Sequence, residues 1–406
     1  MDKLRIGVFL NEEYTPQSGG GFSYYQRIIE KLDLFDFDAK IEVCFLSNKE
    51  LDSHNLNKKV FEIPKAKFNK RYWNVNQRYL FALFSFSLLR YFTIHQKIKN
   101  SIGKKVTIDT INYLKQNKID LIYYPTPEFQ PINYPFIATH WDLGHKSMFA
   151  FPEVSLNKRF EKRENYHSIA LQKAFAIFAE SDQSRKELVA YERINKDRIF
   201  VVPMFAGKVV DLNVNNGAQQ LILDKWKLSK RQFYFYPAQF WAHKNHYGLI
   251  MAFKIILEKH PNFKLVLSGS DKGNLDYIKE VIENNHLENN VVFTGFVSEE
   301  EIYTFYKNTI ALVMPTYLGP TNMPLLEAYY LGCPVLCSNL IGHQEQMGNK
   351  AIYFDANNTN DIAIKMMYVI NVEDKATIMD ETAIGKIINQ HCLSLYTIRK
   401  SFGYNF

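Results

Sequence analysis

Residues 311–338 form a strand–loop–helix–strand pattern whose loop is suited to meet an anion. The apolar run at 311–314 predicts the first strand. The loop after it ends in Gly319, Pro320, Thr321 and Asn322. Thr321 or Asn322 is suited to cap the apolar helix that follows. A helix that begins at the carboxyl end of a parallel strand directs free backbone N–H groups at an anion such as a diphosphate. Glu327, one turn into this helix, brings a carboxylate within reach of a ribose diol.

Lys244 ends a loop between two predicted elements, a strand at 232–236 and a helix at 247–259. A lysine beside a helix start opposes the helix dipole, and this favours an anion between the lysine and the helix. We therefore expect Lys244 to face an anion.

Asp142 and His145 follow a predicted strand at 136–140. An acid and a histidine at a strand end are suited to orient a sugar hydroxyl or to assist proton transfer. The alternative is a structural Asp–His pair that fixes the loop. Gly20 and Gly21 lie between the first predicted strand and helix, where glycine allows the backbone to approach a phosphate or a sugar. Because this loop lacks the GxGxxG spacing, a plain flexible loop is its alternative interpretation.

The segment at 319–335 resembles the core of the retaining family 4 glycosyltransferases (glycosyl transferases group 1), which have the GT-B fold. The family pattern is two glutamates separated by seven residues, in a segment such as EGFGLPxLEAxxxGxPV. The corresponding segment of this chain reads GPTNMPLLEAYYLGCPV. Glu327 matches the second glutamate, whereas Gly319 occupies the position of the first.

Other segments extend the resemblance toward the N-terminus. Asp142 and His145 follow the Asp-Leu-x-His frame of the family, with Trp141 in place of a preceding histidine. Glu180 begins a Glu-Ser pair that family members carry at the cleft between their domains. The glycine-rich loop at 18–21 is similar to the first loop of these enzymes, which also lies at the cleft.

The resemblance implies how a donor is bound. Lys244 matches the family's lysine on the donor diphosphate, whereas Gln239 stands where a partner arginine is often found. Lys244 and the backbone N–H groups of residues 319–322 are expected to stabilise the departing diphosphate, and Glu327 is expected to hold the ribose. Because these groups take the place of a metal, we expect no metal requirement. No cofactor is expected besides the nucleotide diphosphate sugar, which is a co-substrate.

The resemblance also implies a fold class, namely α/β with two Rossmann-like doubly wound domains facing each other across a cleft. We expect an acceptor-binding domain at 1–205, a nucleotide-sugar-binding domain at 206–385, and a helical tail at 386–406 that returns to the first domain. The alternation of predicted strands and helices independently favours two doubly wound domains. The polar residues 207–224 are predicted to form a linker or mobile surface.

The implied reaction moves a hexose from a nucleotide diphosphate sugar to an acceptor hydroxyl, with retention of the anomeric configuration. The expected acceptor is a glycan or a lipid-linked molecule, in the assembly of a bacterial-type surface polysaccharide or glycolipid. A phosphorylase-like or epimerase-like enzyme on the same fold is an alternative. A nucleotide-binding oxidoreductase is disfavoured because GxGxxG is absent. Because Gly319 stands in the position of the family's first glutamate, a non-catalytic sugar-binding or membrane-binding subunit is a further alternative.

The net charge of +7 over 406 residues suits a phosphate-bearing ligand or an anionic surface. Residues 65–105 contain ten Lys or Arg, no Asp or Glu, and nine aromatic residues. This composition favours an amphipathic helix on an anionic membrane, and an ordinary helix with a basic outer face is the alternative. No nucleic-acid-binding signature is present. The longest near-apolar run has 11 residues, too few to span a bilayer, so we expect a cytoplasmic protein, peripheral at the inner face of the cell membrane.

Overall fold

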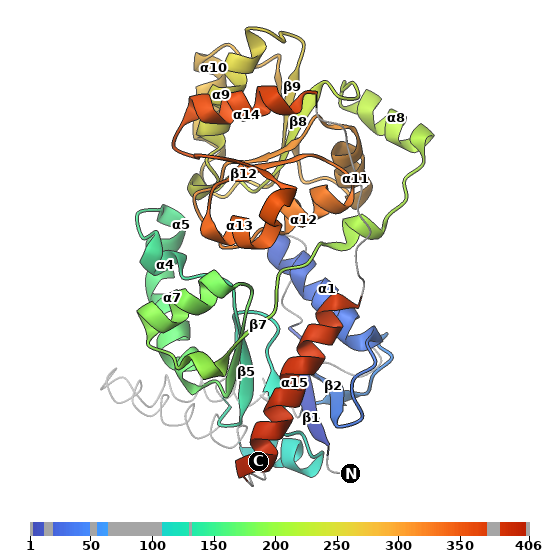
Figure 1. The fold of residues 1–406 in the computed structure, drawn as a ribbon, viewed down its shortest axis with the longest axis vertical. Helices are drawn as coiled ribbons and strands as arrows, with labels where there is room; N and C mark the ends of the chain where they lie inside the picture. The colour runs from blue at the N-terminus through green and yellow to red at the C-terminus, as the bar shows by residue number, and fades with distance from the viewer. Residues whose placement is uncertain are drawn as a thin grey trace, which may run out of the picture. The chain divides into compact units, whose positions relative to one another are not determined.

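Two parallel β-sheets with covering helices make up the computed structural model (Figure 1). The structure describes residues 3–11, 19–48, 55–63, 108–129, 132–371 and 382–402. The predicted basic and aromatic segment at 65–105 lies outside these residues. Among the helices of the described residues, none is long and apolar enough to cross a membrane.

The first sheet has seven strands in the order β3-β2-β1-β4-β5-β6-β7. In that order the strands are Val60–Glu62, Ile41–Ser47, Leu4–Phe9, Leu121–Tyr123, Phe136–His140, Ala176–Ala179 and Ile199–Val201. The pairing of β1 with β2 and with β4 is parallel and in register, with Ile6 opposite both Val43 and Leu121. Helices associated with this part of the chain are α1 (Gly20–Leu34), α4 (Gly144–Ser147), α5 (Pro152–Ser155), α6 (Arg159–Asn165) with a π-helical continuation η3 (Tyr166–Leu171), α7 (Asp182–Glu192) and the 3₁₀ turn η4 (Lys196–Arg198).

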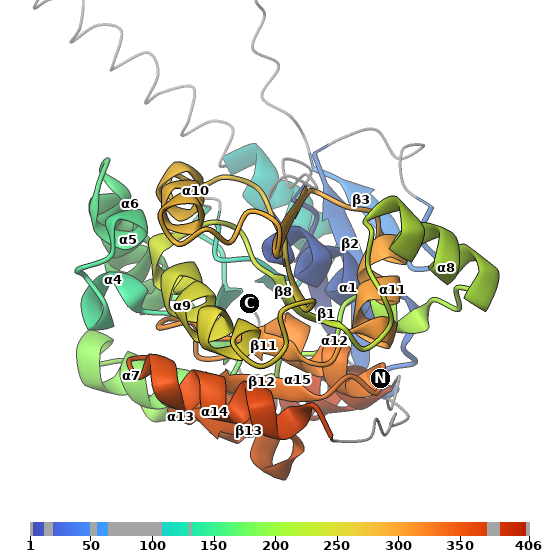
Figure 2. The same cartoon turned by 90° about the horizontal axis from the view of Figure 1, so that it is seen from above.

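The second sheet has six parallel strands in the order β10-β9-β8-β11-β12-β13. In that order they are Val291–Gly295, Lys264–Ser268, Phe233–Pro237, Leu312–Met314, Val335–Ser338 and Ile352–Phe354. The first four side chains of β8 are all fully buried, which is typical of a strand with both faces covered by helices. In Figure 1, α9 (His246–Leu257) and α14 (Thr359–Val369) cover one face of this sheet and α12 (Met323–Tyr330) covers the other. Figure 2 shows α9 and α14 side by side.

The remaining helices also alternate with the strands of the second sheet. They are α10 (Leu275–Asn284), α11 (Glu299–Asn308) and α13 (Ile341–Met347), with the 3₁₀ turns η6 (Ala242–Lys244) and η7 (Gly348–Lys350). The strand order of this sheet reverses between β8 and β11. In open parallel sheets, ligands bind outside the carboxyl ends of the strands at such a reversal. The topology therefore points to the loops after β8 and β11.

The described residues fall into two compact units. One contains β1 to β4 and the part of the helix α15 (Ala383–Phe402) from Asn389 onward, and the other contains α1 and the chain from Ala138 to Ile388. In the first unit the backbone N–H of Asp38 donates to Asn389 Oδ1 (2.9 Å). All residues of the site described below belong to the second unit. The predicted domain limits at 205 and 385 stay a prediction.

The predicted linker at 207–224 is wrong. This stretch contains a 3₁₀ turn, η5 (Lys208–Asp211), and a helix, α8 (Asn216–Lys225). The Asn215 side chain caps α8 by accepting from the N–H of Ala218 (2.9 Å). The polar composition misled the prediction because α8 buries little apolar surface of its own and is held by its cap and its neighbours.

Candidate functional site

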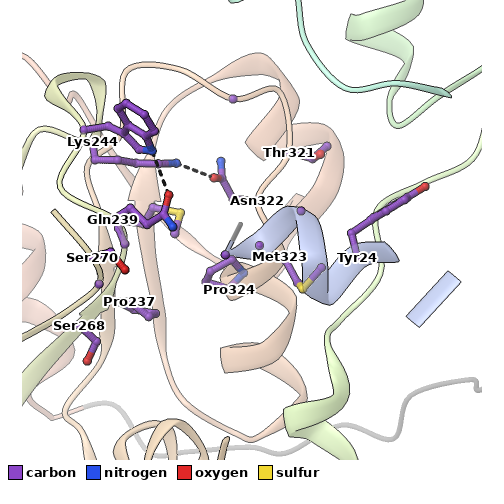
Figure 3. Close-up of a pocket in the computed structure, with 18 of the residues that line it drawn as sticks. Tyr24, Pro237, Gln239, Lys244, Ser268, Ser270, Thr321, Asn322, Met323 and Pro324 are labelled. Atoms are coloured by element: carbon purple, nitrogen blue, oxygen red, sulfur yellow. Dashed lines mark hydrogen bonds between the residues drawn. The ribbon is translucent and has the colours of Figure 1, made fainter. Parts of the chain in front are cut away.

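A cavity of about 440 Å³ lies where β8, β9 and β11 end, and the close-up in Figure 3 shows part of its wall. Its volume falls in the range of small-molecule sites. Most of the predicted site residues line it, and they are Gly20, Gly21, Asp142, Lys244, Gly319, Pro320, Thr321 and Asn322. Two predicted site residues, His145 and Glu327, are not part of the lining.

Lys244 is held on the cavity wall by a tight turn. The turn η6 is followed by Asn245, which adopts a left-handed conformation (φ 53°) and whose side chain caps α9 by accepting from the N–H of Gly248 (3.0 Å). Lys244 Nζ donates to Asn322 Oδ1 (3.1 Å; Figure 3). Burial lowers the pKa of Lys244 to about 8, and the carboxylates of Asp142 and Glu153 offset this only in part. Within the described part of the chain no carboxylate forms a salt bridge with this amine, so a bound anion would stabilise its charge.

The loop before α12 is fixed by α13. Asn322 occupies the cap position of α12, as predicted, but its side chain makes no capping bond. Its amide Nδ2 instead contacts His343 Nε2 (2.8 Å). The backbone N–H of Asn322 donates to Gln346 Oε1 and its carbonyl accepts from Gln346 Nε2 (2.9 Å each). Gly319 has φ 116°, a conformation that is strained for any residue with a side chain. This geometry accounts for a glycine at 319.

Asp142 faces the cavity as an ionised carboxylate. Its Oδ1 accepts from the N–H of Gly144 (2.7 Å) and from the guanidinium of Arg163. Burial raises the pKa of Asp142, but Arg163 and the Gly144 N–H outweigh burial and hold that pKa below its usual value. The carboxylate can therefore accept a hydrogen bond or a proton from a ligand hydroxyl.

His145 lies behind Asp142, away from the cavity. Its side chain is fully buried, its Nδ1 accepts from Arg163 Nε (3.3 Å), and its Nε2 donates to Glu164 Oε2 (3.3 Å). Burial is the main cause that lowers its pKa to about 4, so the ring is neutral. His145 thus supports the arginine that holds Asp142, and a catalytic role of His145 stays a prediction.

Glu327 points toward the chain that leads into the second sheet. The hydroxyl of Tyr306 donates to Glu327 Oε2 (3.0 Å). Burial raises the pKa of Glu327 to about 7, opposed by Tyr306 and by the backbone N–H of Gly207. Met323 and Pro324, which precede Glu327 on α12, line the cavity instead. The contact of Glu327 with a ribose stays a prediction.

Two further residues that line the cavity were not among the predicted catalytic or donor-binding residues. Glu180 follows β6 and is buried at the wall. His243 precedes Lys244, and Glu153 Oε1 accepts from both its backbone N–H (2.8 Å) and its ring Nδ1. The rule that selected Asp142, a polar residue at the carboxyl end of a predicted strand, also applies to Glu180. The sequence carries no signal that joins Glu153 to His243, because the two are ninety residues apart.

Comparison with known proteins identifies the family of the second half of the chain. Residues 219–386 match the family model of the glycosyl transferases group 1. This segment is a group 1 glycosyltransferase domain. The group 1 domain contains Lys244, the loop at 319–322 and Glu327, so the predicted resemblance to the glycosyl transferases group 1 is confirmed there.

A curated relative and two solved structures agree with this assignment. O-antigen chain mannosyltransferase B of Escherichia coli is 26% identical over 223 residues, which are 54% of this chain and 58% of that protein. The match thus covers less than two thirds of the relative. A glycosyltransferase of Rickettsia africae has a TM-score of 0.62 at 17% identity, with both chains fully covered. HepE of Anabaena, solved with UDP and glucose, has a TM-score of 0.61 at 15% identity over 96% of this chain and 99% of its own. The chain therefore has the predicted GT-B fold.

Proposed function

We propose that this protein is a retaining glycosyltransferase that moves a hexose from a nucleotide diphosphate sugar to an acceptor hydroxyl without a metal ion. The observation that carries the proposal is Lys244, a half-buried amine without a salt bridge among the described residues, on the wall of a cavity in a group 1 domain. A diphosphate beside Lys244 would supply the negatively charged partner that no carboxylate of the described residues provides. UDP is bound by HepE of Anabaena, which shares the fold.

The chemistry that we propose is mainly electrostatic. Lys244 and the N–H groups of residues 319–322 stabilise the charge that develops on the leaving diphosphate. Asp142 accepts a hydrogen bond or a proton from a sugar hydroxyl, and His145 acts indirectly by positioning Arg163. Glu327 binds the ribose once its contacts with Tyr306 and Gly207 are exchanged for those with the diol.

The biological setting that we propose is surface polysaccharide or glycolipid assembly, with a glycan or lipid-linked acceptor. It rests on the similarity to O-antigen chain mannosyltransferase B. Mannosyl donors therefore belong in the first substrate screen together with glucosyl donors.

Gly319 supports a second candidate function, binding of a nucleotide sugar without turnover. The position has no side chain, and its φ of 116° disfavours a glutamate there. A non-catalytic protein would bind nucleotide sugars but would neither transfer nor hydrolyse the sugar during long incubation. Release of the nucleoside diphosphate in the presence of an acceptor distinguishes the two functions.

A nucleotide screen with chelator is the first test. We expect UDP or GDP, and one of their glucosyl or mannosyl conjugates, to raise the melting temperature of the protein in excess EDTA, because Lys244 and backbone N–H groups provide the positive potential. Calorimetry then gives the dissociation constants with EDTA and with added magnesium or manganese. Binding or turnover that appears only with the added metal would contradict the metal-independent proposal, and absence of binding in every condition would contradict the donor site.

The second test examines whether residues 65–105 attach the protein peripherally to a membrane. We expect the protein to sediment with liposomes in proportion to their anionic lipid content and to be released by salt, since each basic residue near such a surface contributes roughly 1 kcal/mol. A variant with four basic residues changed to glutamine should bind less, and those residues are Lys67, Lys70, Arg71 and Arg78. The matched control changes four exposed lysines elsewhere, Lys186, Lys196, Lys230 and Lys259. Equal losses in both variants, or no sedimentation of the wild type, would argue against a membrane-binding segment.

A further inference from the structure

Two buried polar side chains on the cavity wall each carry an oxygen atom without a geometric hydrogen-bond partner. Glu180 is 6% exposed and Thr321 is 8% exposed, and both line the cavity. In the part of the chain that the structure describes, neither Glu180 Oε2 nor Thr321 Oγ1 has a hydrogen-bond partner. Buried polar atoms are nearly always paired, because an unpaired one loses its hydrogen bonds to water and gains none. Both atoms are therefore open to a ligand in the cavity.

The charge state of Glu180 narrows the chemistry of that ligand. Burial raises the pKa of Glu180 well above its usual value; the Thr321 hydroxyl beside it opposes this, and the carboxylate of Asp142 adds to it. Burial thus favours the protonated form of Glu180, which both donates and accepts a hydrogen bond. The Thr321 hydroxyl also does both. Ligand hydroxyls, which also donate and accept, complement these two groups.

The position of Thr321 relates these hydroxyls to the proposed anion site. Thr321 directly precedes Asn322, whose Oδ1 accepts from Lys244 Nζ (3.1 Å). The cavity wall thus carries a cationic group at Lys244, and groups at Glu180 and Thr321 that donate and accept hydrogen bonds. A nucleotide diphosphate sugar has the same order of groups, a diphosphate followed directly by a polyhydroxylated ring.

We propose that Glu180 and Thr321 bind hydroxyl groups of the sugar that is transferred and so set the preference for that sugar. This inference rests on the proposed function, since it assumes that the diphosphate lies at Lys244. Glu180 follows β6 in the first sheet and Thr321 precedes α12 in the second, so the two together select a sugar whose hydroxyls reach both.

The experiment compares the contribution of the sugar with that of the nucleotide. Dissociation constants of UDP and UDP-glucose, and of GDP and GDP-mannose, are measured by calorimetry for the wild type and three variants, Glu180→Ala, Glu180→Gln and Thr321→Val. Glu187→Ala is the matched control, because Glu187 lies on α7, is held by Gln183 (3.0 Å) and does not line the cavity. The ratio of the nucleotide-sugar constant to the nucleotide constant is the quantity of interest, because a general loss of folding would change both constants.

We expect Glu180→Ala and Thr321→Val to raise this ratio at least about tenfold, as the loss of a ligand hydrogen bond to a buried group does. Glu180→Gln should stay within about threefold of the wild type, because an amide donates and accepts as a neutral acid does. The nucleotide constants and the Glu187→Ala ratio should not change. An unchanged ratio in Thr321→Val and Glu180→Ala, with nucleotide binding intact, overturns this inference alone. A wild type that binds neither the nucleotides nor their sugars overturns the proposed function and this inference with it.

Discussion

Replacing Lys244 by methionine is expected to weaken nucleotide diphosphate binding by at least about tenfold, because a charge-assisted hydrogen bond to a buried group contributes about 1.5–3 kcal/mol. Methionine keeps most of the apolar stem and removes the charge. The free energy of unfolding should not fall, since burial of the Lys244 amine is unfavourable, as its pKa of about 8 indicates. Calorimetry with UDP and GDP measures the binding, and thermal melting measures the stability.

The control for this variant is Lys254→Met. Lys254 lies on the same helix that follows the Lys244 turn, α9, but it is exposed and its Nζ donates to Asn285 Oδ1 (3.0 Å). It carries the same charge far from the cavity lining, so its variant should bind like the wild type. Equal affinities of Lys244→Met and wild type would show that the diphosphate does not lie at Lys244.

The same lysine predicts how binding depends on pH. An anion prefers the protonated amine, and with a pKa of about 8 in the free protein the amine is mostly protonated below pH 8 and loses its proton above it. The affinity for a nucleotide sugar should therefore fall as the pH rises above about 8. In Lys244→Met this fall should be absent, which a titration series across that range measures.

Replacing Gly342 by alanine is expected to disrupt the loop at 319–322 and to lower both stability and nucleotide affinity. A Cβ on Gly342 would lie 2.5 Å from the carbonyl carbon of Pro320 and still nearer to its oxygen. These are backbone atoms, so the loop itself must move, and with it Asn322 and its contact with Lys244. Overpacking of this kind costs about 1–3 kcal/mol of the free energy of unfolding. Thermal melting and calorimetry measure the two effects.

Gly217→Ala is the matched control. Gly217 lies in the first turn of α8, where a Cβ would meet only Asn215 Oδ1 at 3.4 Å. Alanine in a helix is favoured over glycine by about 0.5–1 kcal/mol, so this variant should be as stable as the wild type or more so. If Gly342→Ala also melts and binds like the wild type, the loop at 319–322 tolerates displacement and is not held rigidly by α13.

Local patterns in the sequence were sufficient to predict many of the helices and strands and the edge of the sheet at which the site lies. The helix α12 begins after Asn322, and β5 has the predicted limits 136–140. These features follow from short-range causes: apolar runs for buried strands, cap residues and proline for helix starts, and glycine where a helix ends. Because parallel strands bring their carboxyl ends to one edge, Lys244 and the loop at 319–322 could be placed together before their contact was known.

Only the tertiary structure decided which of these side chains face the cavity. His145 turns away because Arg163 and Glu164 bind its ring, and Glu327 turns toward Tyr306. Glu180 Oε2 has no hydrogen-bond partner by geometry among the described residues, and this side chain lies at the wall. Position along the chain determines that a residue lies at a strand end or in the first turns of a helix. The direction of its side chain depends on charges, donors and packed groups from distant segments, and these become neighbours only when the chain is folded.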